Sequence, residues 1–409
     1  MTDKFDDSFD FDSDIDDDFN MPVGKHVAGM KSVTPHVSSY DFPNSSTFIK
    51  ENLEEKKTNK TLRICLIVFA VVLAIIIAIF GGMAWWVHNL NNAMKITDPV
   101  AASELNEVLE KPDAIMQSEP FYMVLLGSDA RSGDSQSRSD VTILVRADAT
   151  TGVIDLISIP RDTMIDLDIY GTQKINAAYA YGGPAGSVSA VSEFAGVPVS
   201  HYAEINFDSL VELVDALGGV TVTVPESFNA GNSGGISLEA GEQVLTGEQA
   251  LGFARERYNV SGGDFSRAQA QRLIVTSIIK EVLATPVTEL PGTIEKLLGM
   301  VSTDLTVKDL ITLATQFQKV NLTIYNSATP SYTYFTDGVS YVATMYDEWH
   351  DMMCRVDAGL DPDDESVEIP QAQLDNERLG SATNGASPRD YYDLAANAGM
   401  TTDSIIEID

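Results

Sequence analysis

Basic residues are scarce in this sequence of 409 residues. Lys and Arg total 26 against 60 Asp and Glu, which gives a formal net charge of −34 at pH 7. General binding of nucleic acid requires clustered positive charge on the surface, so this composition excludes it. Any chemistry on phosphate must therefore depend on a few basic residues gathered in one cleft.

Cysteine is also scarce. Cys65 lies in a long apolar run and Cys354 lies far along the chain, so we do not expect them to pair. The sequence therefore does not encode a small secreted scaffold held by disulfides. A chain of this length has room for one large domain with appendages, and that domain must be stable through its hydrophobic core.

One uncharged run, residues 64–87, is 24 residues long. As a helix it would extend about 36 Å, enough to cross the hydrocarbon core of a membrane. It is too long and too far from the start for a cleaved signal peptide. Basic residues precede it closely, whereas Lys95 alone follows closely. The positive-inside rule therefore predicts a single-pass type II membrane protein, with a cytoplasmic N-terminus and the rest of the chain outside.

Changes in composition and hydrophobic pattern divide the sequence into five parts. We expect a disordered acidic cytoplasmic tail over residues 1–61, a transmembrane helix over 62–88 and an extracellular stalk over 89–117. The main folded domain follows over 118–360, and the acidic, polar residues 361–409 are expected to be mostly disordered. The first twenty residues alternate Phe with acidic residues, which favours a solvating tail or, alternatively, a docking motif for a cytoplasmic partner.

Strand patterns and helix patterns alternate through the main domain. Apolar patterns predict strands at residues 121–126, 141–147 and 153–159. A turn that ends in Gly152 is predicted to join the last two. Amphipathic patterns predict helices at 207–219, 246–254, 264–284 and 306–320. The intermixed order predicts an α/β fold, with a central mixed β-sheet covered by helices on both faces.

Charged residues of both signs occur where these strands end. Asp129 follows the first strand and Asp140 precedes the second, so both carboxylates are expected at one edge of the sheet, where ligands bind in open α/β folds. Two carboxylates with room for water suit Mg²⁺, which keeps several waters and is completed by substrate phosphates. Either residue alone would more simply be a turn or strand-end residue.

Arginines also stand at the predicted element ends. Arg161 and Asp162 follow the third strand, and Arg267 and Gln271 share one face at the start of a helix. Arg255 and Arg257 share a face only if the chain leaves its helix by about residue 254. Arginine suits bidentate recognition of phosphate, and a helix N-terminus suits anions. The residues together predict a cradle of mixed sign for a metal-bound pyrophosphate.

Seven segments resemble the LytR-CpsA-Psr family of Gram-positive cell-envelope enzymes and occur in the family's order. They are LLGSDAR, SRSD, SIPRDT, KINAAYAYGG, LVDALGGV, LEAGEQVLTGEQALGFARER and GDFSRAQAQ. The resemblance is strong over residues 121–284 and weaker to about 359. It implies an α-β-α sandwich with an apolar pocket for a prenyl chain, and it makes residues 118–360 an extracellular catalytic domain.

The resemblance also implies the activity. The expected enzyme is a phosphotransferase that moves a glycopolymer from a polyprenyl-pyrophosphate carrier to a peptidoglycan hydroxyl through a phosphodiester link. The implied metal ligands are Asp129 and Asp140, for Mg²⁺ or for Mn²⁺ in its place. The positions implied to bind pyrophosphate are Arg138, Arg161, Arg255, Arg257, Arg267 and Gln271.

One departure from the family pattern is Ala270, where the family usually carries Arg; it removes one peripheral phosphate contact. The base for the acceptor hydroxyl is left open among Asp162, Asp129 and Asp140. We expect Arg131 and Asp134, in the same loop as Asp129, to be exposed.

Other readings of the same residues remain. One alternative is a pyrophosphatase that acts on the same lipid with water as acceptor. Another is a transferase that attaches the glycan to a surface protein. An idle scaffold has no reason to keep paired Asp and clustered Arg. A transcriptional regulator is excluded because the folded domain is predicted outside the membrane. The sequence does not distinguish teichoic acid from capsular polysaccharide or arabinogalactan as the polymer.

Overall fold

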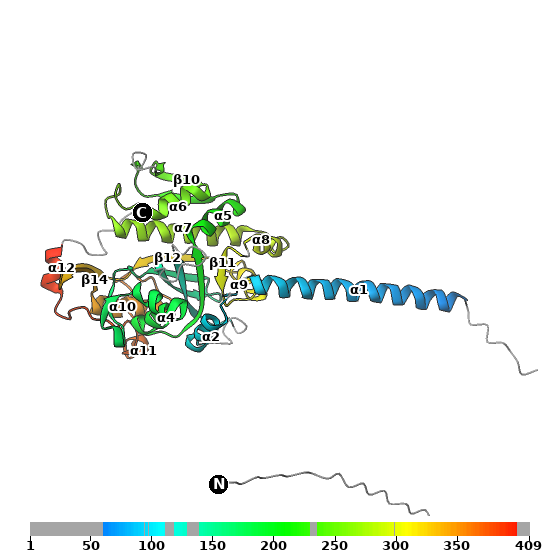
Figure 1. Ribbon diagram of the computed structural model, residues 1–409, viewed down its shortest axis with the longest axis horizontal. Coiled ribbons are helices and arrows are strands. Elements are labelled where there is room, and N and C mark those ends of the chain that lie inside the picture. Colours follow the sequence, from blue (N-terminus) through cyan, green and yellow to red (C-terminus); the bar gives the residue numbers. More distant parts are fainter. Residues whose placement is uncertain are drawn as a thin grey trace, which may run out of the picture. The chain divides into compact units, whose positions relative to one another are not determined.

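The computed structural model describes residues 60–93, 95–96, 98–110, 118–128, 139–229, 235–297 and 299–398 (Figure 1). The chain divides into two units, Met1–Val72 and Leu73–Asp409. Helix α1 spans Lys60–Ala93. Within the part of the chain that the structure describes, no helix is both long and apolar enough to cross a membrane. The expected acidic tail lies outside the described residues as far as residue 59.

A six-stranded sheet forms the centre of the second unit. Its strand order is β11-β6-β1-β2-β3-β12, and β1 pairs antiparallel with β2 but parallel with β6. The prediction of a central mixed sheet is therefore confirmed. The strands are β1 (Phe121–Ser128), β2 (Ser139–Asp148), β3 (Val153–Ser158), β6 (Val199–Asn206), β11 (Val301–Thr303) and β12 (Thr323–Ala328).

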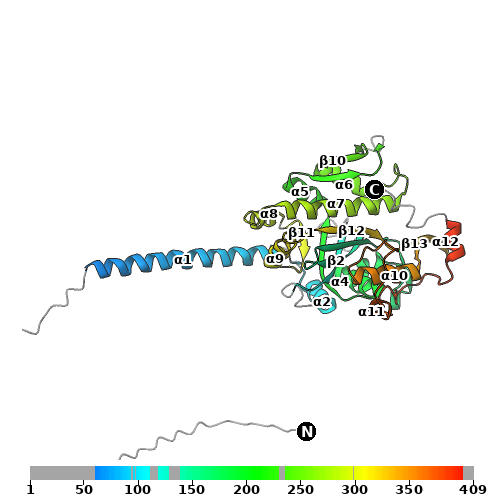
Figure 2. The same cartoon turned by 180° about the vertical axis from the view of Figure 1, so that it is seen from behind.

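Helices cover both faces of this sheet, as the alternating patterns predict (Figures 1 and 2). On one face lie α2 (Pro99–Val108), α4 (Ala177–Ala195) and α10 (Tyr346–Asp357). The other face carries α5 (Phe207–Leu217), α6 (Gly247–Arg255), α7 (Asp264–Ala284), α8 (Leu290–Leu297) and α9 (Val307–Phe317).

The period-two pattern of β1 explains the two cores. Tyr122 and Val124 point to the face of α4 and α10, where the fully buried Trp349 stacks on Phe194 with ring centroids 5.4 Å apart. Phe121, one residue along, joins a second core with residues of α7 and α9. Each face of the sheet thus buries an apolar layer, which is the main stabilising contribution of the fold.

Short strands complete the unit. They pair as β4 (Met164–Asp166) with β5 (Thr172–Lys174), β7 (Val220–Val224) with β10 (Gly241–Leu245), β8 (Phe228–Asn229) with β9 (Ser237–Leu238), and β13 (Ser331–Thr336) with β14 (Val339–Thr344). A 3₁₀ turn, η1 (Asp168–Tyr170), connects β4 to β5. Helices α11 (Gln371–Leu374) and α12 (Tyr392–Ala398) follow α10.

The expected mostly disordered segment from residue 361 is wrong as far as Ala398, because that part of the chain is packed on the domain. Leu379 and Tyr391 are 2% and 1% exposed, and the backbone amide of Gly380 donates to the carbonyl of Ala195. These scattered apolar residues fill gaps over α4 and α10, although the acidic composition around them is typical of disorder. Residues 399–409 lie outside the described residues.

A helix, α2, forms within the expected stalk. Asp98 is the N-cap of α2, and its side chain accepts a hydrogen bond from the amide of Val100. It is not a free stalk, however, because Leu105 and Leu109 are 3% and 5% exposed and belong to the core against α4. Their spacing of four residues places both on one face of the helix.

Candidate active site

Three strand ends meet at one edge of the sheet. Ser128, the last residue of β1, pairs with Ser139, the first residue of β2, after a register shift at Gly127. A Cβ at Gly127 would lie 2.7 Å from a Val141 methyl carbon, so glycine is needed for this close approach. Asp140 therefore stands at the start of β2, beside the end of β1, as the strand pattern predicts.

The loop itself, residues 129–138, lies outside the described residues. The placements of Asp129 and Arg138 at the site, and of Arg131 and Asp134 in solvent, therefore stay predictions.

Arg161 follows β3 and reaches across to the start of β2. Its Nη1 donates to Asp140 Oδ1 at 2.9 Å, and its Nε lies 4.0 Å from Asp162 Oδ1. Although burial opposes the charge, these carboxylates raise the pKa of Arg161 above its ordinary value. The buried Nε has no hydrogen-bond partner among the described residues, so a donor is left for a ligand. Asp162 is also held by Lys174, whose Nζ lies 3.1 Å from Oδ1.

Asp264, the first residue of α7, joins three arginines. Its carboxylate lies 2.9 Å from Arg267 Nη2, 3.8 Å from Arg257 Nη1 and 4.0 Å from Arg161 Nε. The side chain of Arg267 is only 11% exposed, and this burial lowers the pKa of its guanidinium. Three guanidinium groups around one carboxylate leave positive charge that a phosphate group can neutralise.

Sequence reasoning missed this role of Asp264, although a signal was present. An acidic residue in the first turn of a helix is stabilised by the helix dipole, and Arg267 stands three residues further on the same face. The sequence could not show that Arg161 and Arg257 arrive at the same carboxylate, because they come from a different strand end and a different loop.

Arg255 and Arg257 do not point to the same place. Helix α6 ends at Arg255, whose guanidinium lies 5.3 Å from the ring centroid of Phe207. Arg257 follows in a turn in which the Glu256 carboxylate accepts hydrogen bonds from three backbone amides. Burial opposes the charge of Glu256, but these hydrogen bonds lower its pKa. Arg257 thus joins the Asp264 cluster, whereas Arg255 contacts an aromatic residue at the rim of a neighbouring cavity.

Gln271 lies one turn beyond Arg267 on α7, as the spacing predicts, and is 9% exposed. Its Nε2 donates to the carbonyl of Ala254 at 3.1 Å. The preceding Ala270 is 3% exposed and packs in the apolar cluster of β7, α5, α6 and α7. In this chain that position is therefore part of the core, where an arginine would be buried without a partner.

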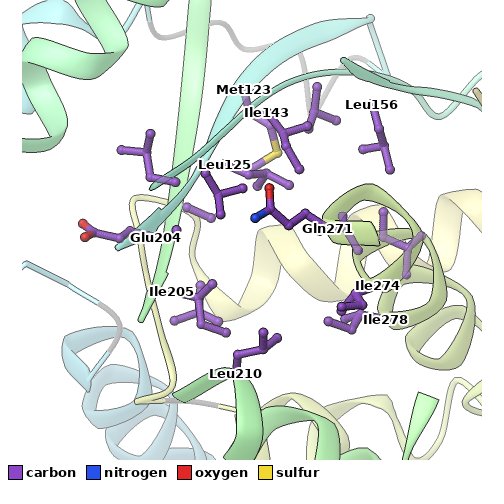
Figure 3. A pocket seen from close by; sticks show the side chains of 18 of the residues that line it. Met123, Leu125, Ile143, Leu156, Glu204, Ile205, Leu210, Gln271, Ile274 and Ile278 are labelled. Carbon is purple, nitrogen blue, oxygen red and sulfur yellow. The ribbon is translucent and has the colours of Figure 1, made fainter. Parts of the chain in front are cut away.

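An apolar cavity of about 320 Å³ opens beside the charged cleft, between the sheet and helices α5, α7 and α9. The labelled apolar side chains point inward from both sides, whereas the carboxylate of Glu204 points away from the cavity (Figure 3). Gln271 lines both this cavity and the cleft that contains Asp140, Arg161 and Arg267. An almost entirely apolar space thus ends beside a cluster of cations. Members of its lining include Met123, Leu125, Ile143, Leu156, Ala203, Ile205, Phe207, Leu210, Ile274 and Ile278.

Glu204 also borders this cavity, but its carboxylate reaches toward Tyr179 of α4. It accepts hydrogen bonds from Ser128 Oγ at 2.8 Å and from Tyr179 OH at 2.6 Å. Burial and the Glu204 carboxylate raise the pKa of the Tyr179 phenol, which therefore remains a donor. This network holds Ser128, the last residue of β1, in place. Sequence reasoning gave no role to these residues.

One described residue, Asp140, offers the type of ligand that suits a hard divalent cation. Asp140 is 30% exposed in its side chain and uses one oxygen on Arg161, so a ligand oxygen and water can both reach a metal there. Among the described residues no group of three or more His, Cys, Asp or Glu is placed to hold a metal. The predicted second carboxylate, Asp129, lies outside those residues.

The chain is similar to known proteins over most of this domain. A profile described as "LytR_cpsA_psr family" matches residues 83–355. A relative from Enterococcus faecalis, named polyisoprenyl-teichoic acid–peptidoglycan teichoic acid transferase TagU, is 30% identical over 290 residues, which cover 69% of this chain and 92% of the relative.

Solved structures share the fold. Protein gbs0355 from Streptococcus agalactiae matches with a TM-score of 0.55 and 24% identity, covering 69% of this chain and 98% of that one. A structure of TagT bound to LI-WTA matches with a TM-score of 0.50 and 26% identity, covering 66% and 94%.

Proposed function

Because the chain belongs to the LytR-CpsA-Psr family, we propose that it moves a glycopolymer from a polyprenyl-pyrophosphate carrier to a peptidoglycan hydroxyl and forms a phosphodiester. The observation that carries this proposal is the junction at Gln271, where an apolar cavity meets a cleft of arginines and Asp140. A polyprenyl pyrophosphate has the same two halves, an apolar chain and a doubly charged head.

The apolar cavity would take the first part of the prenyl chain. Its accessible lining is almost entirely carbon, so a hydrocarbon chain entering it leaves no polar group unsatisfied. Transfer of the chain from water is favoured by roughly 0.8 kcal/mol for each buried methylene group. Arg255, stacked on Phe207 at the rim, would hold a head-group oxygen as the chain enters.

The charged cleft would bind the pyrophosphate. Arg161 offers its unpaired Nε, and Arg257 and Arg267 offer guanidinium groups that Asp264 now partly neutralises. When phosphate oxygens replace part of that interaction, the arginines stabilise charge that develops on the prenyl-phosphate leaving group. Gln271 would mark the border by contacting the first phosphate. Arg138 is proposed to complete the set from the loop.

Asp129 and Asp140 would hold Mg²⁺, or Mn²⁺ in its place. The metal would neutralise phosphate charge and orient the pyrophosphate. Asp162 is proposed as the base for the acceptor hydroxyl, because it stands beside Arg161 at the same strand end, with its Oδ1 4.0 Å from Arg161 Nε. Asp129 and Asp140 remain alternatives for that role.

We further propose that the apolar run at 64–87 anchors the chain in the cell membrane as a single-pass type II protein. The catalytic domain would then face the cell wall, where the lipid carrier and peptidoglycan meet. Residues 1–20 would remain in the cytoplasm, free to contact a partner there. Protease added outside intact cells should remove the domain and leave residues 1–61 intact; loss of the tail instead would reverse this topology.

The test of the activity uses the full chain purified in detergent, with a short-chain polyprenyl-pyrophosphate glycan, Mg²⁺ and peptidoglycan oligomers. Mass spectrometry should find glycan phosphate on the acceptor. The product should disappear with EDTA and in Asp140→Ala, whereas Asp375→Ala, at an exposed position on the surface, should retain activity. Released glycan phosphate without linkage would support the alternative, a pyrophosphatase.

The remaining alternative differs only in its acceptor. If the glycan is destined for a surface protein, the same assay with peptidoglycan alone yields no linked product, and a cell-wall protein fraction restores it. An unchanged rate in Asp140→Ala would refute the metal assignment in every version.

A further inference from the structure

A second cavity, of about 610 Å³, lies on the other face of the sheet from the apolar cavity. It is lined by η1, by α4 from Ala178 to Glu193 and by the segment around Asn384 that follows α10. Its volume falls within the range of roughly 300–1,000 Å³ that small-molecule and cofactor sites occupy. Unlike the first cavity, it has both apolar and polar walls. The site described above uses none of its residues.

Two tyrosines form a platform at this cavity. The rings of Tyr170 and Tyr181 are parallel, with centroids 3.9 Å apart, and the side chains keep 47% and 49% of their surface exposed. The neighbouring Ile169 is 89% exposed. Stacked, half-exposed aromatic rings offer a rigid apolar surface with hydroxyl groups at its edge. The C–H face of a sugar ring matches such a surface, while its hydroxyls reach polar side chains.

The backbone around the platform is held in uncommon conformations. Asp168 has a φ of 45°, which a non-glycine residue rarely adopts, and Gly183 interrupts α4 with a φ of 56°. The interruption turns the first part of α4, which carries Tyr181, away from the regular helix path. The structure therefore maintains the aromatic pair at a local conformational cost, which is common at binding sites.

A buried polar side chain forms part of the wall. Asn384 is 7% exposed, and its Nδ2 donates to the carbonyl of Ala190 at 3.0 Å. Its Oδ1 has no donor among the described residues. A buried, unsatisfied amide oxygen is unfavourable unless a ligand or water supplies a donor, as a sugar hydroxyl or acetamido N–H would. Asn384 comes from the segment that composition alone assigns to a disordered tail.

The charge of the cavity selects among glycans. Its lining contains Asp166, Asp168 and Glu193 and no basic residue. Burial, and next the Asp168 carboxylate, raise the pKa of Glu193. A polymer rich in phosphate would be repelled from these walls, whereas an uncharged sugar or one with an amino group would not. The cavity thus disfavours a teichoic acid chain.

The cavity also lies at a useful distance from the charged cleft. Strand β4 begins just after Asp162, which contacts Arg161, and ends at Asp166 in the cavity wall. Four residues of extended chain span about 13 Å. A glycan strand with one hydroxyl at the cleft and a sugar a few units away on the tyrosines can bridge this distance along the β4–β5 hairpin.

We propose that this cavity is a subsite for an uncharged sugar of the acceptor glycan, at a distance from the hydroxyl that receives the phosphate. The identification of this glycan as the acceptor rests on the proposed function. The binding of an uncharged glycan to the cavity does not depend on it. The platform of Tyr170 and Tyr181 would hold the sugar ring, and Asn384 would accept one of its hydrogen bonds.

The test compares Tyr181→Ala with Phe335→Ala in the full chain. Phe335 is an aromatic residue 68% exposed on β13 and lines neither cavity, so it is the matched control. Binding of a tetrasaccharide of β-1,4-linked N-acetylglucosamine, which is uncharged, is measured by calorimetry. Loss of one ring contact should weaken binding about fivefold to tenfold in Tyr181→Ala. Asn384→Leu, which keeps the approximate size and removes the acceptor oxygen, should weaken it as well.

The transfer assay supplies a second measurement. Tyr181→Ala should raise the KM for the peptidoglycan acceptor by the same factor and leave the KM for the lipid donor unchanged. A rise in the donor KM alone would overturn the proposal and assign the cavity to the donor polymer. Unchanged tetrasaccharide binding in Tyr181→Ala and Asn384→Leu would also overturn it, even where transfer proceeds. If transfer fails in the wild-type chain while tetrasaccharide binding depends on Tyr181, the subsite stands and the proposed function fails.

Discussion

Filling the apolar cavity should affect stability and lipid binding in opposite directions. Ala203 lies on β6 between its neighbours in β1 and β11, and it lines the cavity. Leucine at this position adds three carbon atoms to a space of about 320 Å³. At about 0.8 kcal/mol per buried methylene, less roughly 0.5–1 kcal/mol of side-chain entropy, Ala203→Leu should raise the free energy of unfolding by about 1.5 kcal/mol.

The same three carbons occupy space that the prenyl chain would fill. Affinity for a polyprenyl pyrophosphate should therefore fall by about 2 kcal/mol, or roughly thirtyfold. Urea unfolding followed by tryptophan fluorescence gives the first quantity, and equilibrium binding of a long-chain lipid gives the second. Ala372→Leu, at an exposed position of α11, is the control and should change neither. A gain in stability with unchanged lipid affinity would refute the assignment of the cavity to the lipid.

Further changes test other parts of the structure. Arg257→Ala should weaken binding of polyprenyl pyrophosphate by about 1–2 kcal/mol, because a partly exposed guanidinium is lost; equal affinity in a binding titration would place it outside the cradle. Tyr391→Ala should destabilise the domain by about 3–5 kcal/mol in urea unfolding, whereas its 62% exposed neighbour Tyr392→Ala should not; similar losses would contradict the packing. Burial raises the pKa of Asp155 to about 7, although Arg146 opposes the shift, so the folded state favours the neutral acid. The resulting contribution to the free energy of unfolding is full below about pH 4 and declines as the pH rises to 7. Asp155→Asn should flatten that part of the stability–pH curve, and an unchanged curve would assign it to other groups.

The sequence predicts the central sheet well because its strands carry a simple pattern. Residues 121–126 and 141–147 are almost continuously apolar, as strands buried on both faces are, and the turn before Val153 ends in a glycine with a φ of 82°. Alternation with helical patterns then leaves few topologies. The pairing of β6 beside β1, and of β12 beside β3, depends on contacts between distant segments that no local pattern contains.

The candidate site is predicted by residue type more fully than by contact. Asp140 and Arg161 do meet, as their strand-end positions suggest, and Arg267 and Gln271 do share one face of α7. The sharing of Asp264 by three arginines could not be predicted, because it depends on where the turn after α6 returns. The apolar cavity has no signature either, since its lining residues have the same composition as a core.

The C-terminal segment shows where composition misleads. Acidic and polar residues dominate beyond residue 361, but Leu379 and Tyr391 each fill a gap in a core formed by other elements. A segment with few apolar residues cannot fold by itself, yet it can dock on a domain that already exposes matching gaps. Composition measures the first property and not the second.

The position of Gln271 has a consequence for which polymers the protein can serve. The amide lies where the prenyl chain of the carrier would join its phosphates. The prenyl chain and the pyrophosphate are common to every lipid-linked polymer of this kind. The proposed enzyme would thus recognise the polyprenyl-pyrophosphate carrier and not the polymer attached to it. It would transfer whichever polymer the cell assembles on that carrier. A change of cell-wall polymer would therefore require new enzymes that assemble the polymer, and no change in the residues around Gln271.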